Sequence, residues 1–288
     1  MSLIQRIQEC HRYDLKEFYP FVVCGQQVGW VHHHFAELLK LHSNVFCLDQ
    51  GQLSMHRSLT TPRQRTSAAH TVFKKLFNQG ALEGWRDEDY AVATGWGQPV
   101  LLNVERAAVV KLGIKGYGLH VNGYQGHGAN LKLWVAKRSQ NRPVAPGKLD
   151  HLVAGGLPIG LSLHENLIKE AHEEAGISKT IAIQAKPVGA LSYMMQLQQG
   201  MRCDTIFCYD LELPGTFTPV NQDGEVDSFY LWPIEQVRHH LETTQDFKFN
   251  TALVIADFMI RHGVIKPDES GYLDLIAALH PSIPSFSK

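Results

Sequence analysis

The chain has 288 residues, of which 44% are hydrophobic and 19% are charged, a balance that is typical of a globular protein and excludes a disordered or collagen-like chain. At roughly 150 residues per domain, this length suggests two domains. Its 27 Lys and Arg residues against 28 Asp and Glu residues give a net charge of −1, which argues against nucleic acid as a partner.

The cysteines and the N-terminus bear on the compartment. Five scattered cysteines without a CxxC pair favour reduced thiols, and they are Cys10, Cys24, Cys47, Cys203 and Cys208. The N-terminal segment 1–14 carries four charged residues and lacks the apolar core of a signal peptide. The longest uncharged stretch, 18–36, is too polar to span a bilayer. We therefore expect a cytoplasmic protein with no membrane contact.

The first part of the chain mixes short apolar runs with helical patterns. The runs at 21–24 and 45–48 are typical of strands. Residues 61–79 favour a helix, because Pro62 stands at its start and Gly80 directly follows its end.

Strand-like segments dominate beyond residue 108, and we expect strands at 117–121, 131–136, 181–183 and 203–211. This change from mixed helix and strand patterns to mainly strand patterns predicts a domain boundary near residue 110. We therefore expect an N-terminal domain at 1–110 and a second domain at 111–288.

One predicted helix carries an unusual group of carboxylates. Ser162 and Glu165 form a capping box, and Gly176 stands where a glycine ends a helix, so we expect a helix over 163–175. Three glutamates, Glu170, Glu173 and Glu174, project from one turn of it. Like charges at this spacing cost about 0.2–0.5 kcal/mol per pair. The cluster is either a solvated acidic face or a set of oxygen ligands for Mg²⁺ or Mn²⁺.

The segment around this helix resembles the Nudix box, G-x5-E-x7-R-E-U-x-E-E-x-G-U, in which U is a bulky aliphatic residue. The matching residues are Gly155-x5-Leu161-x7-Lys169-Glu170-Ala171-x-Glu173-Glu174-x-Gly176-Ile177, with Leu161 and Lys169 in place of the motif's Glu and Arg. The resemblance implies an α/β fold, namely a Nudix α/β/α sandwich with a mixed sheet, preceded here by a smaller α+β domain. It also implies metal ligands, which are Glu170, Glu173, Glu174 and the carbonyl of Gly155. The implied cofactor is Mg²⁺, with Mn²⁺ as the alternative.

Three further runs, at 84–90, 209–214 and 221–226, together resemble a Nudix subfamily with an extra N-terminal domain, found alone and fused to thiamine pyrophosphokinase in fungi. Members of that subfamily are similar to thiamine diphosphate phosphatases. The resemblance therefore implies a hydrolase that converts thiamine diphosphate, or its damaged oxo and oxy forms, to the monophosphate and phosphate. ADP-ribose and other nucleoside diphosphate derivatives are the alternative substrates. The departures at Leu161 and Lys169 leave open a third hypothesis, a Nudix-like binding module without catalysis.

The remaining candidate residues follow from the diphosphate chemistry. Many Nudix enzymes have a late carboxylate that binds metal or activates water, and Glu225 stands near that point. We name Glu173 and Glu225 as catalytic candidates. Arg138 and Lys148 are the candidate contacts to the phosphates, because they are among the basic residues nearest to the box. The expected partner is a small diphosphate, and a homodimer is left open.

Overall fold

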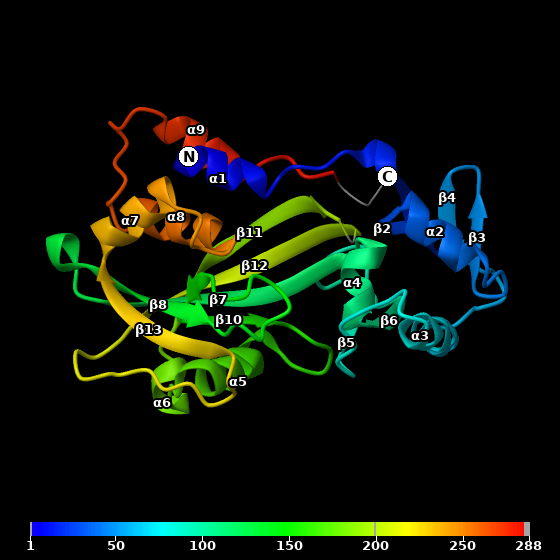
Figure 1. Ribbon diagram of the computed structural model, residues 1–288, viewed down its shortest axis with the longest axis horizontal. Coiled ribbons are helices and arrows are strands. Elements are labelled where there is room, and N and C mark those ends of the chain that lie inside the picture. Colours follow the sequence, from blue (N-terminus) through cyan, green and yellow to red (C-terminus); the bar gives the residue numbers. More distant parts are fainter. Residues whose placement is uncertain (1, 199, 285–288) are drawn as a thin grey trace.

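The computed structural model describes residues 2–198 and 200–284, which form a smaller and a larger half (Figure 1). The smaller half contains a four-stranded sheet of order β2–β1–β4–β3 that packs with two helices. Its elements are β1 (Phe18–Val23), β2 (Gln26–His32), α2 (His33–Lys40), β3 (Phe46–Asp49), β4 (Gln52–Met55) and α3 (Pro62–Asn78). Large apolar side chains such as Phe21, Phe46 and Phe73 fill the space between sheet and helices.

Local signals set the ends of these elements. The Thr61 hydroxyl accepts a hydrogen bond from the Gln64 amide, and the Gln64 side chain accepts one from the Thr61 amide, so that α3 begins at Pro62 as the sequence predicts. The expected strands at 21–24 and 45–48 lie mostly within β1 and β3. A separate hairpin of β5 (Asp89–Val92) and β6 (Leu102–Glu105) leads through α4 (Arg106–Leu112) to the larger half.

The larger half is built on a seven-stranded sheet of order β11–β12–β7–β8–β13, in which β10 also pairs with β7 and β9 with β8. Strands β12 and β7 run parallel and the other pairs are antiparallel, so the sheet is mixed. The strands are β7 (Lys115–Gln125), β8 (Lys132–Arg138), β9 (Leu149–His151), β10 (Val153–Gly156), β11 (Lys186–Leu197), β12 (Gly200–Glu212) and β13 (Val226–Pro233).

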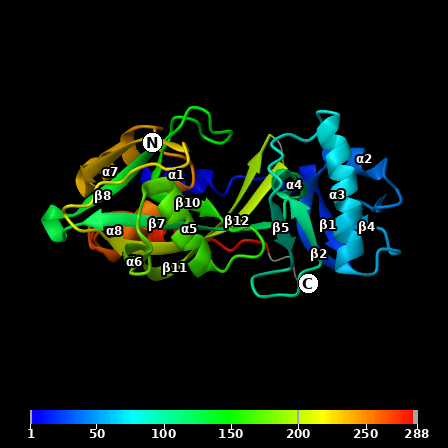
Figure 2. The same ribbon diagram turned by 90° about the horizontal axis from the view of Figure 1, so that it is seen from below.

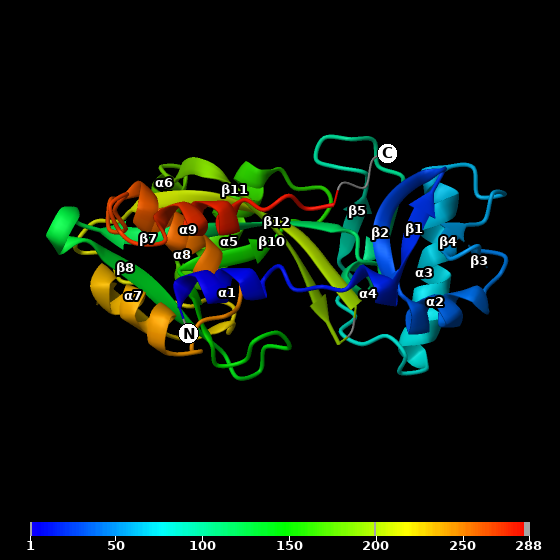
Figure 3. The ribbon, with the colours of Figure 1, turned by 90° about the horizontal axis from the view of Figure 1, so that it is seen from above.

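Helices cover both faces of this sheet (Figures 2 and 3). One face carries α5 (Leu163–Ala175) and α6 (Lys179–Ala182), and the other carries α1 (Leu3–Glu9), α7 (Ile234–Thr243), α8 (Thr251–Arg261) and α9 (Tyr272–Leu279). The expected α/β/α sandwich with a mixed sheet is confirmed, and so is the smaller α+β region before it. Helix α1 packs through Leu3 and Ile7 against the C-terminal helices, so the start of the chain lies with the larger half.

The expected strands at 117–121, 131–136 and 203–211 lie in β7, β8 and β12, but the one at 181–183 is wrong. Residues 179–182 form the short helix α6 instead. Ile177 and Ala182 both enter the apolar cluster beneath α5, and a helical turn is the arrangement that brings them there. The alternation in Ile181-Ala182-Ile183 is too short to outweigh this packing.

The close approach of β2 to the end of α4 generates a prediction about stability. A Cβ atom on Gly29 would lie 2.3 Å from the carbonyl oxygen of Leu112, so Gly29→Ala must displace backbone. We expect its melting temperature to fall by about 3–10 °C, which corresponds to ~1–3 kcal/mol in a chain of this size. Calorimetry should show a change of less than about 1 °C for the control Gly215→Ala, because nothing lies within 4 Å of that added atom. Equal melting temperatures for the two variants would contradict the packing described.

Candidate active site

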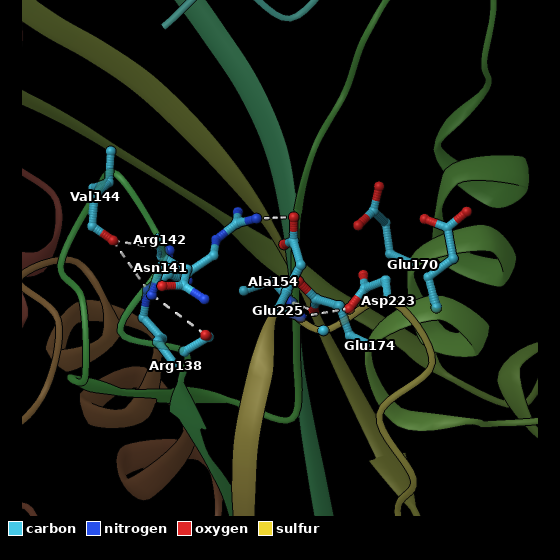
Figure 4. A network of polar contacts seen from close by, with 12 residues as sticks. Arg138, Asn141, Arg142, Val144, Ala154, Glu170, Glu174, Asp223 and Glu225 are labelled. Carbon is cyan, nitrogen blue, oxygen red and sulfur yellow. Dashed lines mark hydrogen bonds and ion pairs between the residues drawn. The ribbon is translucent and has the colours of Figure 1, made fainter.

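The carboxylate helix α5 begins and ends as the sequence predicts. The Ser162 hydroxyl accepts from the Glu165 amide (3.2 Å), and the Glu165 carboxylate accepts from the Ser162 amide (2.8 Å). Gly176 ends the helix in the left-handed conformation, with φ of 64°. The apolar face of α5, with Leu167, Ala171 and Ala175, packs into the cluster beneath it. This packing turns the glutamates toward β10 and the loop around Asp223 (Figure 4).

Glu174 is the most deeply buried of the three glutamates, with 5% of its surface exposed. Its Oε2 accepts a hydrogen bond from the amide of Ala154 (2.7 Å). Burial, with a contribution from the nearby charge of Glu170, raises the pKa of Glu174 to about 8. A carboxyl group in this state is ready to exchange its proton for a cation.

Glu170 lies directly against the backbone of β10. A Cβ atom on Gly155 would come 2.4 Å from the Cδ of Glu170, so only glycine permits this approach. Burial raises the pKa of Glu170, although the adjacent Lys169 acts in the opposite direction. The Gly155 of the motif thus makes room for a carboxylate.

Lys169 relieves part of the charge that the glutamates gather. Its Nζ lies 3.0 Å from Glu170 and 2.9 Å from Glu173, and these contacts help to raise the pKa of the lysine. The pairs are partly exposed, and such pairs contribute only about 0.2–1 kcal/mol. Lys169 therefore makes ion pairs from the position at which the motif has Arg.

The loop before β13 brings a second group of charges to the site. The Gln222 amide donates to the carbonyl of Glu173 (2.9 Å), and Asp223 accepts from the Glu225 amide (2.8 Å). Burial and the charge of Glu173 raise the pKa of Asp223. Glu225 forms an ion pair with Arg142, which Figure 4 shows extending toward the carboxylates.

Asp223 and Arg142 were not among the residues expected to form the site. Asp223 lies in an Asn-Gln-Asp-Gly turn, and only the fold brings that turn to the end of α5. Arg142 belongs to the same basic run as Arg138, so the sequence marked this run as basic but did not show which of its side chains faces the carboxylates.

Arg138 and Lys148, the expected phosphate contacts, have other partners, which corrects that expectation. Arg138 is buried, with 8% of its surface exposed. Its guanidinium pairs with Asp150 (2.9 Å) and donates to the carbonyls of Val144 and Ala145. The Nζ of Lys148 donates to the carbonyl of Gln245 (2.7 Å). Arg138 thus holds the loop that carries Arg142 to the sheet, and Lys148 contacts the Gln245 carbonyl. Arg142 is the basic residue that faces the carboxylates.

The carbonyl of Gly155, the expected backbone ligand, points away from the carboxylates. The carbonyl oxygen of Gly155 lies on the side of β7, only 2.7 Å from where a Cβ on Gly118 would be. The amide of Ala154 points to Glu174, and in a strand the N–H and C=O of one residue point to the same side. The carbonyl of Ala154, in place of that of Gly155, therefore faces the carboxylates.

The N-terminal half forms one wall of this site. The hydroxyl of Tyr90 lies over Gly156, where an added Cβ would be 2.3 Å away, and the Ile159 amide donates to the carbonyl of Asp89 (3.0 Å). Arg106 pairs with Glu88 (2.7 Å), and the charge of Glu88 helps to raise the pKa of Glu170.

The residues at this site fit a hard divalent cation. The five carboxylates of Glu170, Glu173, Glu174, Asp223 and Glu225 face two cationic side chains, Lys169 and Arg142. Three of these carboxyl groups have raised pKa values, which indicates an excess of negative charge in a poorly solvated place. Oxygen ligands of this kind suit Mg²⁺ or Mn²⁺.

Another group of potential ligands lies beneath the sheet. Among the described residues, His120, Asp150 and His151 have ligand atoms within 4.8 Å of one another. Asp150, however, already accepts from Arg138 and Lys248 (2.9 Å each) and from Thr251 (2.7 Å). Two buried cations beside the carboxylate repel a third, and the group is better described as an ion cluster centred on Asp150 that anchors β8, β9 and α8.

Comparisons with known proteins identify the family. Nudix hydrolase 24, chloroplastic, from Arabidopsis thaliana is 46% identical over 282 residues, which cover 96% of this chain and 77% of that protein. The chain belongs to the Nudix hydrolases. Nudix hydrolase 20, chloroplastic, from the same plant is 46% identical over 289 residues, with the same coverage of 96% and 77%. The family model described as a domain of unknown function (DUF4743) matches residues 2–116.

Among solved structures, the chain matches the MutT protein from Methanosarcina mazei Go1, at 16% identity and a TM-score of 0.38, covering 50% of this chain and 94% of that one. As a Nudix hydrolase, this chain has pyrophosphatase-type activity, and the family generally depends on divalent metals. The expected cytoplasmic location is wrong, because both plant relatives are chloroplastic proteins. Among the described residues, no helix has the length and apolar character needed to cross a bilayer.

The raised pKa of Glu174 predicts a pH-dependent stability in the absence of metal. Below about pH 4.5 this group is protonated in both states, and between there and about pH 8 the folded state alone holds the proton, so the free energy of unfolding falls steadily across this interval and is level above it. At pH 9 we expect Glu174→Gln to melt about 5 °C or more above the wild type, and at pH 4 to melt near it.

Scanning calorimetry in EDTA measures this difference. Added Mg²⁺ should raise the melting temperature of the wild type at pH 9 and leave that of Glu174→Gln nearly unchanged. A constant difference between the two proteins from pH 4 to 9 would show that Glu174 titrates normally.

Proposed function

We propose that this Nudix hydrolase converts thiamine diphosphate, or its oxo and oxy forms, to the monophosphate and phosphate with Mg²⁺ as the cofactor. One observation carries the proposal. Two of the runs that resemble the thiamine diphosphate phosphatase-like subfamily, 84–90 and 221–226, border the carboxylate cluster from opposite halves of the chain. The residues that set this subfamily apart are therefore in a position to select a substrate. The thiamine assignment itself rests on the resemblance.

The reaction requires water to attack phosphorus through clustered negative charge. When bound by Glu170, Glu173, Glu174 and the carbonyl of Ala154, Mg²⁺ would offset the charge of the diphosphate and lower the pKa of a bound water. Arg142, held in place by the loop that Arg138 anchors, is the proposed phosphate contact. It replaces Arg138 and Lys148 in that role.

Glu225 is the proposed general base. Glu173 is already paired with Lys169, whereas Glu225 has Arg142 as its ionic partner. When Arg142 turns to a phosphate oxygen, the Glu225 carboxylate is left free to accept a proton from the attacking water. Glu173 then serves as a metal ligand.

A substrate comparison tests the reaction. Phosphate release with Mg²⁺ is measured for thiamine diphosphate and its oxo form, and product formation is measured for ADP-ribose and a nucleoside diphosphate sugar. We expect kcat/KM for the thiamine compounds to be at least about tenfold higher, which is a difference of ~1.4 kcal/mol in transition-state binding. Faster turnover of ADP-ribose would transfer the proposal to the alternative substrates, and no turnover of any compound would favour a binding module.

Removal of one metal-binding charge tests the site. Glu174→Gln keeps the size and the hydrogen-bond acceptor of the side chain but loses the charge, and we expect kcat to fall at least about 100-fold. Glu165→Gln, on the exposed face of the same helix, is the matched control, because glutamine also completes a capping box. Steady-state phosphate release should show the control within about twofold of the wild type. Equal activity of the two variants would remove Glu174 from the mechanism.

A further inference from the structure

The loop between β5 and β6 exposes a large aromatic side chain beside the active site. Trp96 has 52% of its surface exposed, although tryptophan is highly buried on average. Its ring centroid lies 4.9 Å from that of Tyr117 and 4.7 Å from that of Phe207, both of which are partly buried. One side of the indole therefore rests on two rings of the larger half, and a large part of it is open to solvent.

The loop holds this position through its backbone. The carbonyl of Thr94 accepts a hydrogen bond from the Nζ of Lys115 (2.8 Å), and the Leu101 amide donates to the carbonyl of Val92 (2.9 Å). Gly95 and Gly97 flank the tryptophan, the latter with φ of 73°. The exposed ring is thus carried by an anchored turn.

Strand pairing places this aromatic group on the same face of the sheet as the carboxylates. Phe207 pairs with Leu119 on β7, and Leu119 pairs with Gly155, which lies against Glu170. Tyr117 lies two residues from Leu119, on the same face of its strand, and its carbonyl accepts from the Leu157 amide (2.8 Å). Two residues of strand span about 7 Å, so the aromatic group adjoins the carboxylate cluster.

The two halves of the chain meet beside this aromatic group. Tyr90 lies over Gly156, Asp89 accepts from Ile159, and Trp96 follows a few residues later on Tyr117. A diphosphate at the carboxylates would have its organic group within reach of these rings.

We propose that Trp96, supported by Tyr117 and Phe207, forms the platform on which the heteroaromatic ring of the substrate stacks. The inference rests on the proposed function, because it takes the carboxylate cluster as the place where the diphosphate is hydrolysed. Stacking on an indole face favours the binding of a flat ring, and the π-electrons of the indole further favour a ring that carries a positive charge. The N-terminal half thereby contributes a specificity-determining residue to a reaction whose ionic groups lie in the larger half.

Steady-state kinetics of the full chain test this role. We expect Trp96→Ala to raise KM about tenfold for the best heteroaromatic substrate of the comparison above, with kcat within about twofold, because stacking contributes binding and no chemistry. Trp96→Phe retains an aromatic face and should recover most of the affinity. With an alkyl diphosphate, which has no ring, Trp96→Ala and wild type should have equal kcat/KM.

A binding measurement is independent of turnover. Thiamine, which carries the rings without phosphates, should quench tryptophan fluorescence in the wild type and in Trp85→Phe, and quench it less in Trp96→Phe. Trp85 is the matched control because it lies elsewhere in the N-terminal half, beneath Lys74.

Several outcomes would overturn the platform. They are an unchanged KM in Trp96→Ala, an equal loss for the alkyl and heteroaromatic diphosphates, or a change in oligomeric mass on size exclusion with unaltered kinetics, which would mark Trp96 as a contact between copies. Preference for ADP-ribose would overturn the thiamine assignment alone, since the same variants then test the platform with adenine as the ring.

Discussion

The rest of the site depends on one electrostatic constraint, the gathering of carboxylates from a single helical turn against the bare backbone of β10. Glu174 is buried on the Ala154 amide, and Glu170 occupies space that only Gly155 leaves free. Such a group is stable only with protons or cations, since burial disfavours the charged form. Lys169 and Arg142 offset part of the negative charge, and the raised pKa of Glu174 indicates that some of it remains unbalanced. A divalent cation held by these carboxylates would balance the remaining negative charge and would supply a Lewis acid for diphosphate hydrolysis.

The surrounding structure holds this cluster in place from two directions. Beneath the sheet, the buried Asp150 gathers Arg138, Lys248 and Thr251 and fixes the loop from which Arg142 extends. From the other side, the N-terminal half reaches Gly156 with Tyr90 and brings the Arg106–Glu88 pair close to Glu170. The half that matches a domain of unknown function therefore takes part in shaping the site.

The sequence predicted those features that depend on neighbouring residues. Helix α5, its caps and the shared face of its three glutamates follow from spacing alone, and the structure has them as predicted. Arg138 was misassigned because its partners Asp150 and Lys248 are distant in the chain, and nothing local distinguishes an arginine in an ion cluster from one that faces a ligand. The roles of Asp223, Arg142 and Tyr90 likewise depend on how loops from different parts of the chain meet. The chloroplastic relatives contradict the expected cytoplasmic location, because a composition unlike that of a secretory signal carries no information about chloroplast targeting.

The measurement that tests the account most directly is calorimetric titration of the metal-free protein with Mn²⁺ near pH 7, in two buffers of different ionisation enthalpy. The account predicts that binding releases about one proton, because Glu174 is protonated before the cation enters and must lose its proton to bind it. It also predicts that Glu174→Gln weakens binding at least about tenfold and abolishes the proton release. Equal affinity in the wild type and in Glu174→Gln would contradict the account, because the cation would then be held elsewhere.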